Sequence, residues 1–257
     1  MQHSPFFLPV TTPSSAASFL LSQKGSGNFV LTLNTEMIAH ALIDPDFARI
    51  IQATPFRICD SIGAKLIGEF YRPTSTVSRI TGVDLGSSIL SLCAREQIPV
   101  FLLGGKEGVA ERAKDQLCQI HAELPVVGTA HGYFSQTDLP ALRGAIHRSG
   151  ARVVFVCLGS PLQERWIIDN RAALPNVELF LPLGGSLDVW AGNLCRAPMI
   201  WRKTGTEWLF RILTSPQKGE RIARLSAAVR TLRTNRSRLG ELMNSFGLNY
   251  VESDNRV

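Results

Sequence analysis

The sequence predicts an α/β fold in which a mostly parallel sheet is covered by helices on both faces. Short apolar runs alternate along the chain with longer segments that have the helical spacing of apolar residues, as at Val109, Ala113 and Leu117. This alternation is typical of parallel sheets, because successive parallel strands need a long connection that is usually a helix. The runs that we expect to form strands are 28–33, 99–103, 125–127, 152–158 and 178–183.

The length and composition favour one compact α/β domain with an appendage. A chain of 257 residues, 45% of them hydrophobic, can bury a complete core. We expect an N-terminal extension over 1–27, the α/β core over 28–200 and a basic helical C-terminal appendage over 201–257. The five cysteines are scattered singly, which favours a reducing cytoplasm over a disulfide framework or a zinc site.

The sequence lacks the pattern of a membrane-spanning segment. No window approaches the roughly 20 consecutive apolar residues that a transmembrane helix needs. The apolar start of the chain has no preceding basic cluster and is interrupted by Pro9 and Pro13, unlike a signal peptide. We therefore predict a cytoplasmic protein in which any membrane contact is peripheral.

Positive charge is concentrated near the C-terminus. The net charge is +6, and the segment from Arg202 to Arg238 contains ten basic residues against two acidic ones. This excess favours a phosphate-bearing partner, which can be a nucleic acid, an anionic lipid or a diphosphate substrate. An apolar stripe in the same segment predicts a basic amphipathic helix that lies on an anionic membrane or docks on its own domain. The stripe consists of Ile222, Leu225, Val229, Leu232 and Leu239.

A polar or glycine-rich turn follows each expected strand. Because the carboxyl ends of parallel strands meet at one edge of a sheet, these turns should line one cleft. Glycine lets backbone N–H groups approach a ligand closely, and the helix N-terminus after the turn favours an anion such as a diphosphate. We therefore predict a nucleotide-type ligand, although any single turn can also be a tight connection without one. The residues assigned to this site are Asn34, Gly104, Gly105, Gly159, Gly184 and Gly185.

Asp60 is the candidate catalytic base. It follows an apolar pair at an expected strand end, where its carboxylate could accept a proton from an acceptor hydroxyl. The spacing equally favours Asp60 as the cap of a helix that starts at Ile62. Asp44 and Asp46 match a D-x-D metal pattern, but they flank a proline and do not follow a strand. They are typical of a turn and helix start, so we predict no metal and no other cofactor.

Two further segments carry aromatic or polar groups near the expected strand ends. Tyr133 could offer a ring on which a base stacks, but the pattern alone favours a core position for an aromatic residue after a strand. The segment 163–165 (Gln-Glu-Arg) opens a helix after Gly159. It either places polar side chains beside the cleft or forms an ordinary charged first turn. The pattern alone therefore assigns neither Tyr133 nor the segment 163–165 to a ligand.

Nine blocks of the sequence, taken in order, resemble the WecG/TagA/CpsF glycosyltransferases, which form glycosyltransferase family 26. The resemblance extends from about residue 28 to about residue 225, and nine ordered blocks make it specific. The blocks are TLNTE (32–36), CDSIG (59–63), RITGVD (79–84), FLLGG (101–105), HGYF (131–134), LGSPLQE (158–164), GGSLDV (184–189), RAP (196–198) and GTEWLFR (205–211).

The resemblance implies an inverting, metal-independent transferase with a Rossmann-like core. Its donor would be a UDP-hexose of the UDP-glucose, UDP-N-acetylmannosamine or uronate type. Its acceptor would be an undecaprenyl-diphosphate-linked sugar used to build a bacterial surface polymer. Ser61 stands where many members have glycine, and Leu162 stands where many have lysine. Contacts with the donor or the acceptor are therefore expected to differ from those of better-known members.

Site roles follow from the same resemblance. Asp60 matches the proposed base of the family, and Thr32 and Arg79 match the residues beside that base. The positions implicated in holding the uridine nucleotide are Tyr133, Gln163 and Asp188. The tail arginines expected to close over the site and grip the acceptor diphosphate are Arg211, Arg221 and Arg224.

Two other classes of protein compete with this assignment. An NAD(P)-dependent oxidoreductase could use the same kind of cleft, but the segment 103–108 lacks the G-x-G-x-x-G fingerprint. A non-catalytic module that binds a membrane or a nucleic acid would leave the turns unexplained. We therefore predict three partners, a UDP-sugar, a polyprenyl-diphosphate-linked sugar and the membrane surface, and no nucleic acid. A homo-oligomer stays open.

Overall fold

The chain groups into two compact units. The structure, a computed structural model, describes residues 6–7, 10–71, 78–215 and 217–245. One unit, which we call the sheet unit, comprises Thr12–Thr32 and Thr81–Arg196. The other, the helical unit, comprises the described residues of Met1–Thr11, Leu33–Ile80 and Ala197–Val257.

The sheet unit contains a parallel sheet with the strand order β2-β7-β6-β4-β5. β4 and β6 are buried along their whole length, as apolar runs are when helices cover both faces of a sheet. Val153 of β6 pairs with Val100 of β4 on one side and with Leu179 of β7 on the other, so the turns after these strands lie along one edge. The strands are β2 (Asn28–Leu33), β4 (Val100–Gly104), β5 (Val126–Ala130), β6 (Val153–Cys157) and β7 (Leu179–Pro182).

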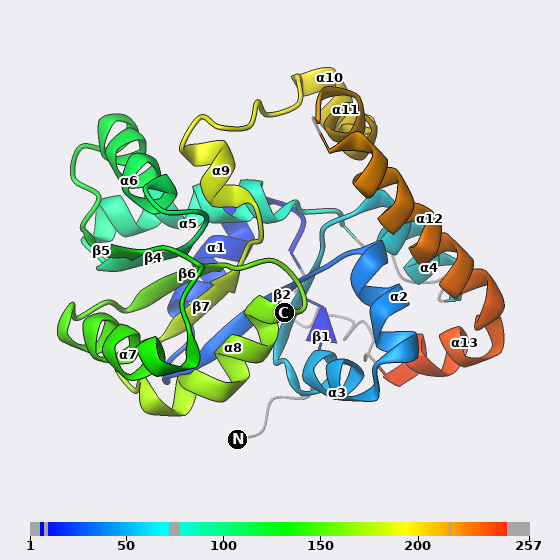
Figure 1. Cartoon of the computed structure of the whole chain (residues 1–257), viewed down its shortest axis with the longest axis horizontal. Helices are drawn as coiled ribbons and strands as arrows, with labels where there is room; N and C mark the ends of the chain where they lie inside the picture. The colour runs from blue at the N-terminus through cyan, green and yellow to red at the C-terminus, as the bar shows by residue number, and fades with distance from the viewer. Residues whose placement is uncertain (1–5, 8–9, 72–77, 216, 246–257) are drawn as a thin grey trace, which may run out of the picture. The chain divides into compact units, whose positions relative to one another are not determined.

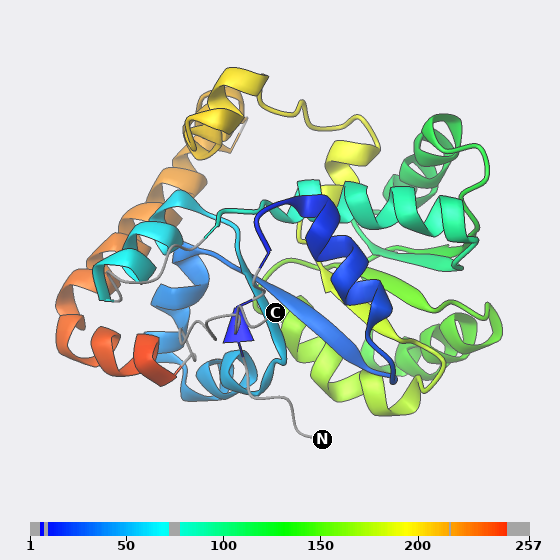
Figure 2. The same cartoon turned by 180° about the vertical axis from the view of Figure 1, so that it is seen from behind.

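Helices cover both faces of this sheet. α7 (Leu139–Arg148) and α8 (Leu162–Asn170) lie on one face, and α1 (Pro13–Ser22) packs with α5 (Gly82–Glu96) on the other (Figures 1 and 2). α1 falls within the expected N-terminal extension but belongs to the sheet unit. The remaining helices, which pack on each other, are α6 (Val109–Ile120) and α9 (Ser186–Trp190). The predicted α/β, Rossmann-like fold is therefore confirmed.

The helical unit is built around α2 (Thr35–Ile43). α2 packs against two neighbours in sequence and against two helices near the C-terminus. These four are α3 (Pro45–Ala53), α4 (Ile62–Tyr71), α12 (Lys218–Thr234) and α13 (Arg236–Ser245). The other elements are β1 (Phe6–Phe7), which pairs in parallel with β3 (Phe56–Cys59), and the helices α10 (Met199–Lys203) and α11 (Glu207–Thr214). Residues near the C-terminus thus share a core with residues 33–80.

A buried arginine fixes the end of α3 in the helical unit. Arg57 of β3 is fully buried, and its guanidinium donates hydrogen bonds to the carbonyls of Ile51 and Gln52 at 2.6–3.0 Å. Burial lowers the pKa of Arg57 to about 10. The guanidinium thereby satisfies carbonyl groups that the end of a helix leaves without partners.

The predicted strands are confirmed within about three residues at each end. The predicted single amphipathic helix near the C-terminus is wrong, because α12 ends at Thr234 and Leu239 lies on α13. Asn235 accounts for the break, since both its backbone N–H and its side-chain amide donate to the carbonyl of Thr231. A side chain that competes for helix carbonyls in this way favours a helix end.

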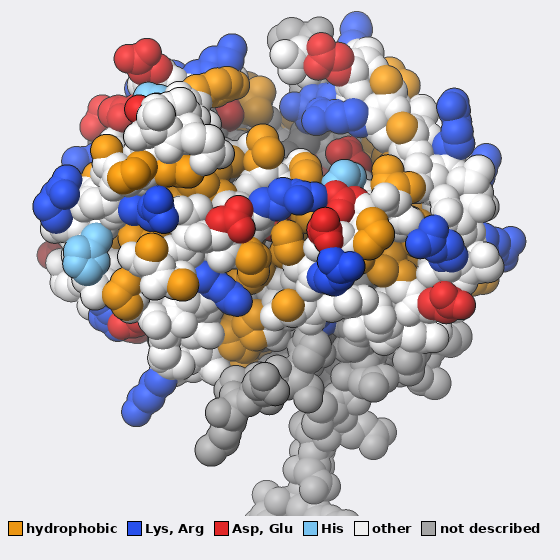
Figure 3. All heavy atoms as spheres, turned by 60° about the horizontal axis from the view of Figure 1, so that its bottom comes forward, with side chains coloured by type: hydrophobic (Ala, Val, Ile, Leu, Met, Phe, Trp, Pro, Cys, Tyr) orange, Lys and Arg blue, Asp and Glu red, His pale blue; other side chains and the backbone are white. Residues whose placement is uncertain are grey.

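Charged side chains of both signs are interspersed with apolar ones on the face drawn in Figure 3. Within the described ranges, no helix has the length and hydrophobicity required to cross a lipid bilayer. Large apolar side chains are nevertheless exposed on α10 and α11, namely Met199, Ile200, Trp208 and Leu213.

Candidate active site

Glycine turns follow three neighbouring strands at the carboxyl edge of the sheet unit. Gly104 ends β4 and is followed by Gly105, Gly159 lies after β6, and Gly184 lies after β7. A Cβ atom at Gly159, Gly184 or Gly185 would meet no atom within 4 Å. The backbone of these two turns is therefore open to close approach by a ligand, as the sequence predicts.

The side chain of Gln163, in the first turn of α8, bridges the turns that follow β6 and β7. Its side-chain oxygen accepts hydrogen bonds from the backbone N–H of Gly159 at 3.2 Å and of Gly184 at 2.8 Å. Its side-chain nitrogen donates to Oε1 of Glu164 at 2.8 Å. Gln163 is buried, so this side chain sets the spacing of the β6 and β7 turns. The two N–H groups are engaged within the protein, and the glycines offer a ligand close approach instead.

Glu164 is a completely buried carboxyl group that supports Gln163. Burial raises the pKa of Glu164, and hydrogen bonds from Gln163 and Ser160 oppose this rise. One of the two alternatives that the sequence allows for this segment is an ordinary charged first turn. For Glu164 this alternative is wrong, because its carboxyl group is buried. Helical spacing does carry the signal, because Gln163 lies three residues before the buried Trp166 and Glu164 lies three residues before the buried Ile167.

The Glu164→Gln variant should gain stability relative to the wild type as the pH rises. The pKa of Glu164 is higher in the folded protein than in the unfolded chain. Glu164 therefore contributes stability to the wild type below the unfolded pKa, and this contribution is lost as the pH rises through the folded pKa. Glutamine keeps the acceptor for Gln163 but cannot ionise. Urea unfolding between pH 5 and pH 9 would measure the difference. The exposed Glu123→Gln control should follow the wild-type curve, and equal curves for all three proteins would contradict the assignment.

The segment after β5 lies beside the glycine turn of β4. The N–H of Gly132 donates to the carbonyl of Gly105 at 2.8 Å, and a Cβ at Gly132 would lie 3.3 Å from the Cα of Gly104. The side chain of Tyr133 is 73% exposed, so the expectation of a core position is wrong for this residue. Its ring is therefore available to a ligand at this end of the sheet.

Thr32 and Asp188 occupy defined positions in the sheet unit. Thr32 is buried on β2, and its hydroxyl donates to the carbonyl of Pro182, at the end of β7, at 3.3 Å. Asp188 is half-buried on α9, and its Oδ1 accepts from Asn193 at 3.1 Å. Thr32 thus helps to hold the strand that leads into the Gly184 turn, and Asp188 follows that turn.

In the helical unit, Asp60 lies between the end of β3 and the start of α4. Its N–H donates to the carbonyl of Leu33 at 2.9 Å. The hydroxyl of Ser61 accepts from the N–H of Ala64 at 3.1 Å, so Ser61 rather than Asp60 caps α4. The same hydroxyl also contacts the N–H and the hydroxyl of Thr35 at 3.2 and 3.0 Å. Ser61 therefore supplies the side-chain cap at the start of α4.

Replacing Ser61 by alanine should destabilise the protein through the loss of this cap. A cap substitution of this kind costs about 1 kcal/mol, which lowers Tm by about 2–4 °C in a protein of this size. Thermal unfolding followed by circular dichroism would measure the change. Ser61→Thr keeps the hydroxyl and serves as the control. A Tm for Ser61→Ala equal to that of the wild type would show that the contacts with Ala64 and Thr35 contribute nothing.

Arg79 lies beside the strand that leads to Asp60. It forms an isolated parallel bridge with Cys59, and its Nη2 donates to the carbonyl of Arg202 at 2.6 Å. Burial raises the pKa of the Cys59 thiol to about 12, the charge of Asp60 adds to this rise, and the charges of Lys65 and Arg79 oppose it. The structure therefore brings Asp60 and Arg79 together around Cys59 and connects Arg79 to α10.

Asn34 and Asp44 serve as helix caps. The side chain of Asn34 accepts from the N–H of Met37 at 3.0 Å at the start of α2, and Asp44 accepts from Phe47 at 3.0 Å at the start of α3. The predicted turn and helix start at the D-x-D pattern is therefore confirmed. Across the part of the chain that the structure describes, no group of three or more potential metal-ligating side chains is found.

The three tail arginines lie on α11 and α12. Arg221 donates from Nε to the hydroxyl of Ser215 at 3.0 Å, and Arg224 is exposed. Arg211 lies within α11, but its side chain is outside the described part of the structure. The assignment of these residues to a diphosphate stays a prediction.

The candidate residues form two groups. The glycines, Gln163, Tyr133, Asp188 and Thr32 belong to the sheet unit, whereas Asp60, Arg79, Asn34 and the tail arginines belong to the helical unit. Sequence reasoning missed the contribution of Glu164 and the cap formed by Ser61.

The comparison with known families identifies the chain. The model of the glycosyl transferase WecG/TagA/CpsF family matches residues 8–240, which is most of the sequence and includes every candidate residue named above. A match of this extent covers the glycine turns and Gln163 as well as Asp60 and the C-terminal helices. The chain therefore belongs to the WecG/TagA/CpsF family and is a glycosyltransferase of cell-envelope polysaccharide synthesis.

Proposed function

We propose that the protein transfers a hexose from a UDP-sugar to an undecaprenyl-diphosphate-linked sugar, with inversion at the anomeric carbon. The candidate donors are of the UDP-glucose, UDP-N-acetylmannosamine or uronate type. The observation that carries the proposal is the pair of glycine turns held by Gln163, whose open backbone suits a nucleotide diphosphate. Family membership favours glycosyl transfer over the nicotinamide-dependent oxidation that such a sheet edge could also support.

The sheet unit is the proposed donor site. Gly159, Gly184 and Gly185 have no side chains that would exclude a diphosphate, and Gln163 holds the two turns at a fixed spacing. The exposed ring of Tyr133 can stack on uracil, which has an aromatic face. The carboxylate of Asp188 can accept hydrogen bonds from ribose hydroxyls or from the uracil N–H. These contacts would recognise the nucleotide and leave the sugar at the edge of the site.

The helical unit is the proposed source of the base. As the acceptor hydroxyl attacks the anomeric carbon from the face opposite UDP, its proton moves to the carboxylate of Asp60. The bond between the anomeric carbon and the diphosphate oxygen breaks, and UDP leaves with the electron pair. Arginine side chains can stabilise phosphate charge through charge-assisted hydrogen bonds, which makes a metal-independent reaction chemically reasonable. The residues proposed for this role are Arg79 near Asp60 and Arg211, Arg221 and Arg224 on the C-terminal helices.

The C-terminal helices are the proposed membrane contact. α10 and α11 expose Ile200 (69%), Leu213 (61%) and Trp208 (45%). α12 follows with exposed arginines such as Arg224 and Arg230. Exposed apolar side chains next to basic ones suit the interface of an anionic bilayer. A peripheral position on the cytoplasmic face of the membrane would bring the enzyme to its lipid acceptor.

The proposal is tested by measuring UDP release from a panel of UDP-hexoses in the presence of EDTA. The purified full chain is incubated with each donor, with and without a polyprenyl-diphosphate-linked sugar. Release that depends on the acceptor and survives EDTA is expected for one donor class. Release that stops in EDTA and returns with a divalent cation would overturn the metal-independent mechanism. No release with any donor would overturn the choice of nucleotide.

A further inference from the structure

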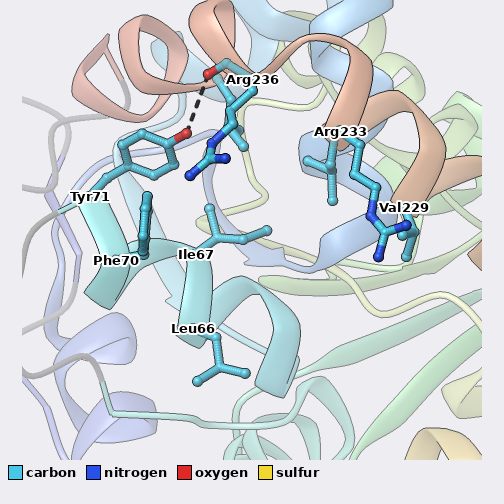
Figure 4. Close-up of a pocket in the computed structure, with 9 residues that line it drawn as sticks. Leu66, Ile67, Phe70, Tyr71, Val229, Arg233 and Arg236 are labelled. Carbon is cyan, nitrogen blue, oxygen red and sulfur yellow. Dashed lines mark hydrogen bonds between the residues drawn. The ribbon is translucent and has the colours of Figure 1, made fainter.

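An apolar groove lies between α4 and the C-terminal helices of the helical unit (Figure 4). Its volume is about 340 Å³, which falls at the lower end of the range typical of small-molecule sites. α4 contributes Leu66 and Phe70, and the opposite wall contains Val229, Leu232 and Leu239. Leu66 and Phe70 are large apolar side chains, yet they are 59% and 63% exposed. The groove therefore offers apolar surface to an occupant.

Two arginines give this apolar groove a positive charge. Arg233 and Arg236 belong to its lining, together with the aromatic pair of α4 (Figure 4). The guanidinium carbon of Arg236 lies 5.8 Å from the centre of the Phe70 ring, within the range of a cation–π contact. The hydroxyl of Tyr71 donates to the carbonyl of Arg236 at 3.3 Å. Arginines beside an apolar wall match the chemistry of an anionic amphiphile, in which a hydrocarbon chain carries phosphate.

The two ends of α4 lie near two segments that flank α11 and α12 in the sequence. At the start of α4, a Cβ on Gly205 would lie 3.4 Å from Ile62, and Gly205 lies two residues before the start of α11. At the end of α4, a Cβ on Gly240 would lie 3.2 Å from the ring of Tyr71, and Gly240 belongs to α13. Between these two points the chain forms α11 and α12, and the last turns of α12 line the groove through Val229, Leu232 and Arg233.

The order of groups along these helices matches the order of groups in a lipid acceptor. The groove residues Leu66 and Phe70 lie about 9–15 Å along α4 from Asp60, at 1.5 Å per residue. Arg221 and Arg224 lie in the first half of α12, before the groove residues Val229 and Leu232. Along α4 the groove residues follow the Asp60 carboxylate, and along α12 they follow these arginines. The acceptor presents a sugar hydroxyl, then a diphosphate, then a hydrocarbon chain.

We propose that this groove binds the first isoprene units of the polyprenyl chain of the acceptor. The inference rests on the proposed function, because that function supplies the lipid. It assigns part of the affinity for the acceptor to the hydrocarbon chain. It also gives the helix that follows Asp60, α4, a role in acceptor binding. Removing apolar contacts from the groove should therefore weaken long-chain acceptors selectively.

Two acceptors with the same sugar diphosphate, one esterified to a methyl group and one to a C55 isoprenoid, would test the groove in the UDP-release assay. Phe70→Gln is expected to raise KM for the C55 acceptor about tenfold and to leave kcat, and the KM for the methyl acceptor, unchanged. Leu66→Gln should act in the same direction, and Ile120→Gln on α6, where the side chain is 71% exposed, is the matched control. Equal effects of Phe70→Gln on both acceptors, or no effect on either, would overturn the proposal.

A binding experiment separates the groove from the catalytic proposal and from a general membrane contact. A benzophenone-bearing polyprenyl monophosphate in detergent should label peptides of α4, α12 or α13, and Phe70→Gln should reduce this labelling several-fold. Binding to phosphatidylglycerol vesicles without isoprenoid should be unchanged in Phe70→Gln. Labelling elsewhere in the chain, or an equal loss of vesicle binding, would contradict an isoprenoid site. Labelling of these helices by a protein that releases no UDP from any donor would refute the proposed function and keep the groove.

Discussion

Asp60→Asn should lower kcat by about 10²–10⁴-fold, because asparagine cannot take the proton from the acceptor hydroxyl. The substitution keeps the cap of α4 and the backbone contact of residue 60. Ser61 caps α4, so the helix keeps its start, and the N–H of residue 60 can still donate to the carbonyl of Leu33. We therefore expect Tm to stay within about 2 °C of the wild type. Steady-state UDP release at saturating donor and acceptor would measure kcat.

Asp46→Asn is the matched control for this loss of charge. Asp46 lies in the same unit, its side chain is 70% exposed, and its partner Arg49 is 74% exposed. The control should retain wild-type kcat, which would also speak against a metal held by the D-x-D pattern. An Asp60→Asn variant that keeps more than about a tenth of wild-type kcat would show that another group takes the proton. In that case Asp60 would serve only to position the substrate.

The sheet and the glycine turns along its carboxyl edge could be predicted from the sequence because their signals are local. The run VVFVC at 153–157 is apolar on both sides of the strand, as only a strand with helices on both faces can be. The glycines that follow β4, β6 and β7 lie immediately after these runs, so the parallel arrangement determines that they share an edge. The same local information places the turn at Asp44, where a capping side chain precedes Pro45.

The assignments that failed depend on contacts between distant residues. The burial of Glu164 follows from the packing of α8 and from the hydrogen bonds that join Gln163 to Gly184, twenty-one residues away. The spacing favoured Asp60 as the cap of α4, whereas the structure has Ser61 there. The contact of Ser61 with Thr35 of α2 depends on the packing of two segments that are 26 residues apart. The packing of α12 and α13 on α2 could not be predicted, because the periodicity of a helix does not specify which other helix it contacts.

Two Gly→Ala variants are expected to separate the stability of the glycine turns from their role in donor binding. Gly104 has a φ of +137°, and a Cβ there would lie 2.3 Å from the carbonyl oxygen of Cys157. Gly104→Ala should therefore cost about 3 kcal/mol or more and lower Tm by at least about 6 °C. Gly185 has a φ of −79°, and a Cβ there would meet nothing within 4 Å. Gly185→Ala should unfold at the wild-type temperature.

The same Gly185→Ala variant is expected to raise KM for the UDP-sugar about tenfold or more. The added methyl group would occupy the proposed binding position of the diphosphate. Gly144→Ala on α7 is the control, since a Cβ there meets only the end of the Arg148 side chain. Thermal unfolding and donor KM would be measured for all three variants. A Gly185→Ala protein with wild-type KM would place the diphosphate away from the β7 turn. Because its stability is expected to be unchanged, a raised KM could not be attributed to unfolding.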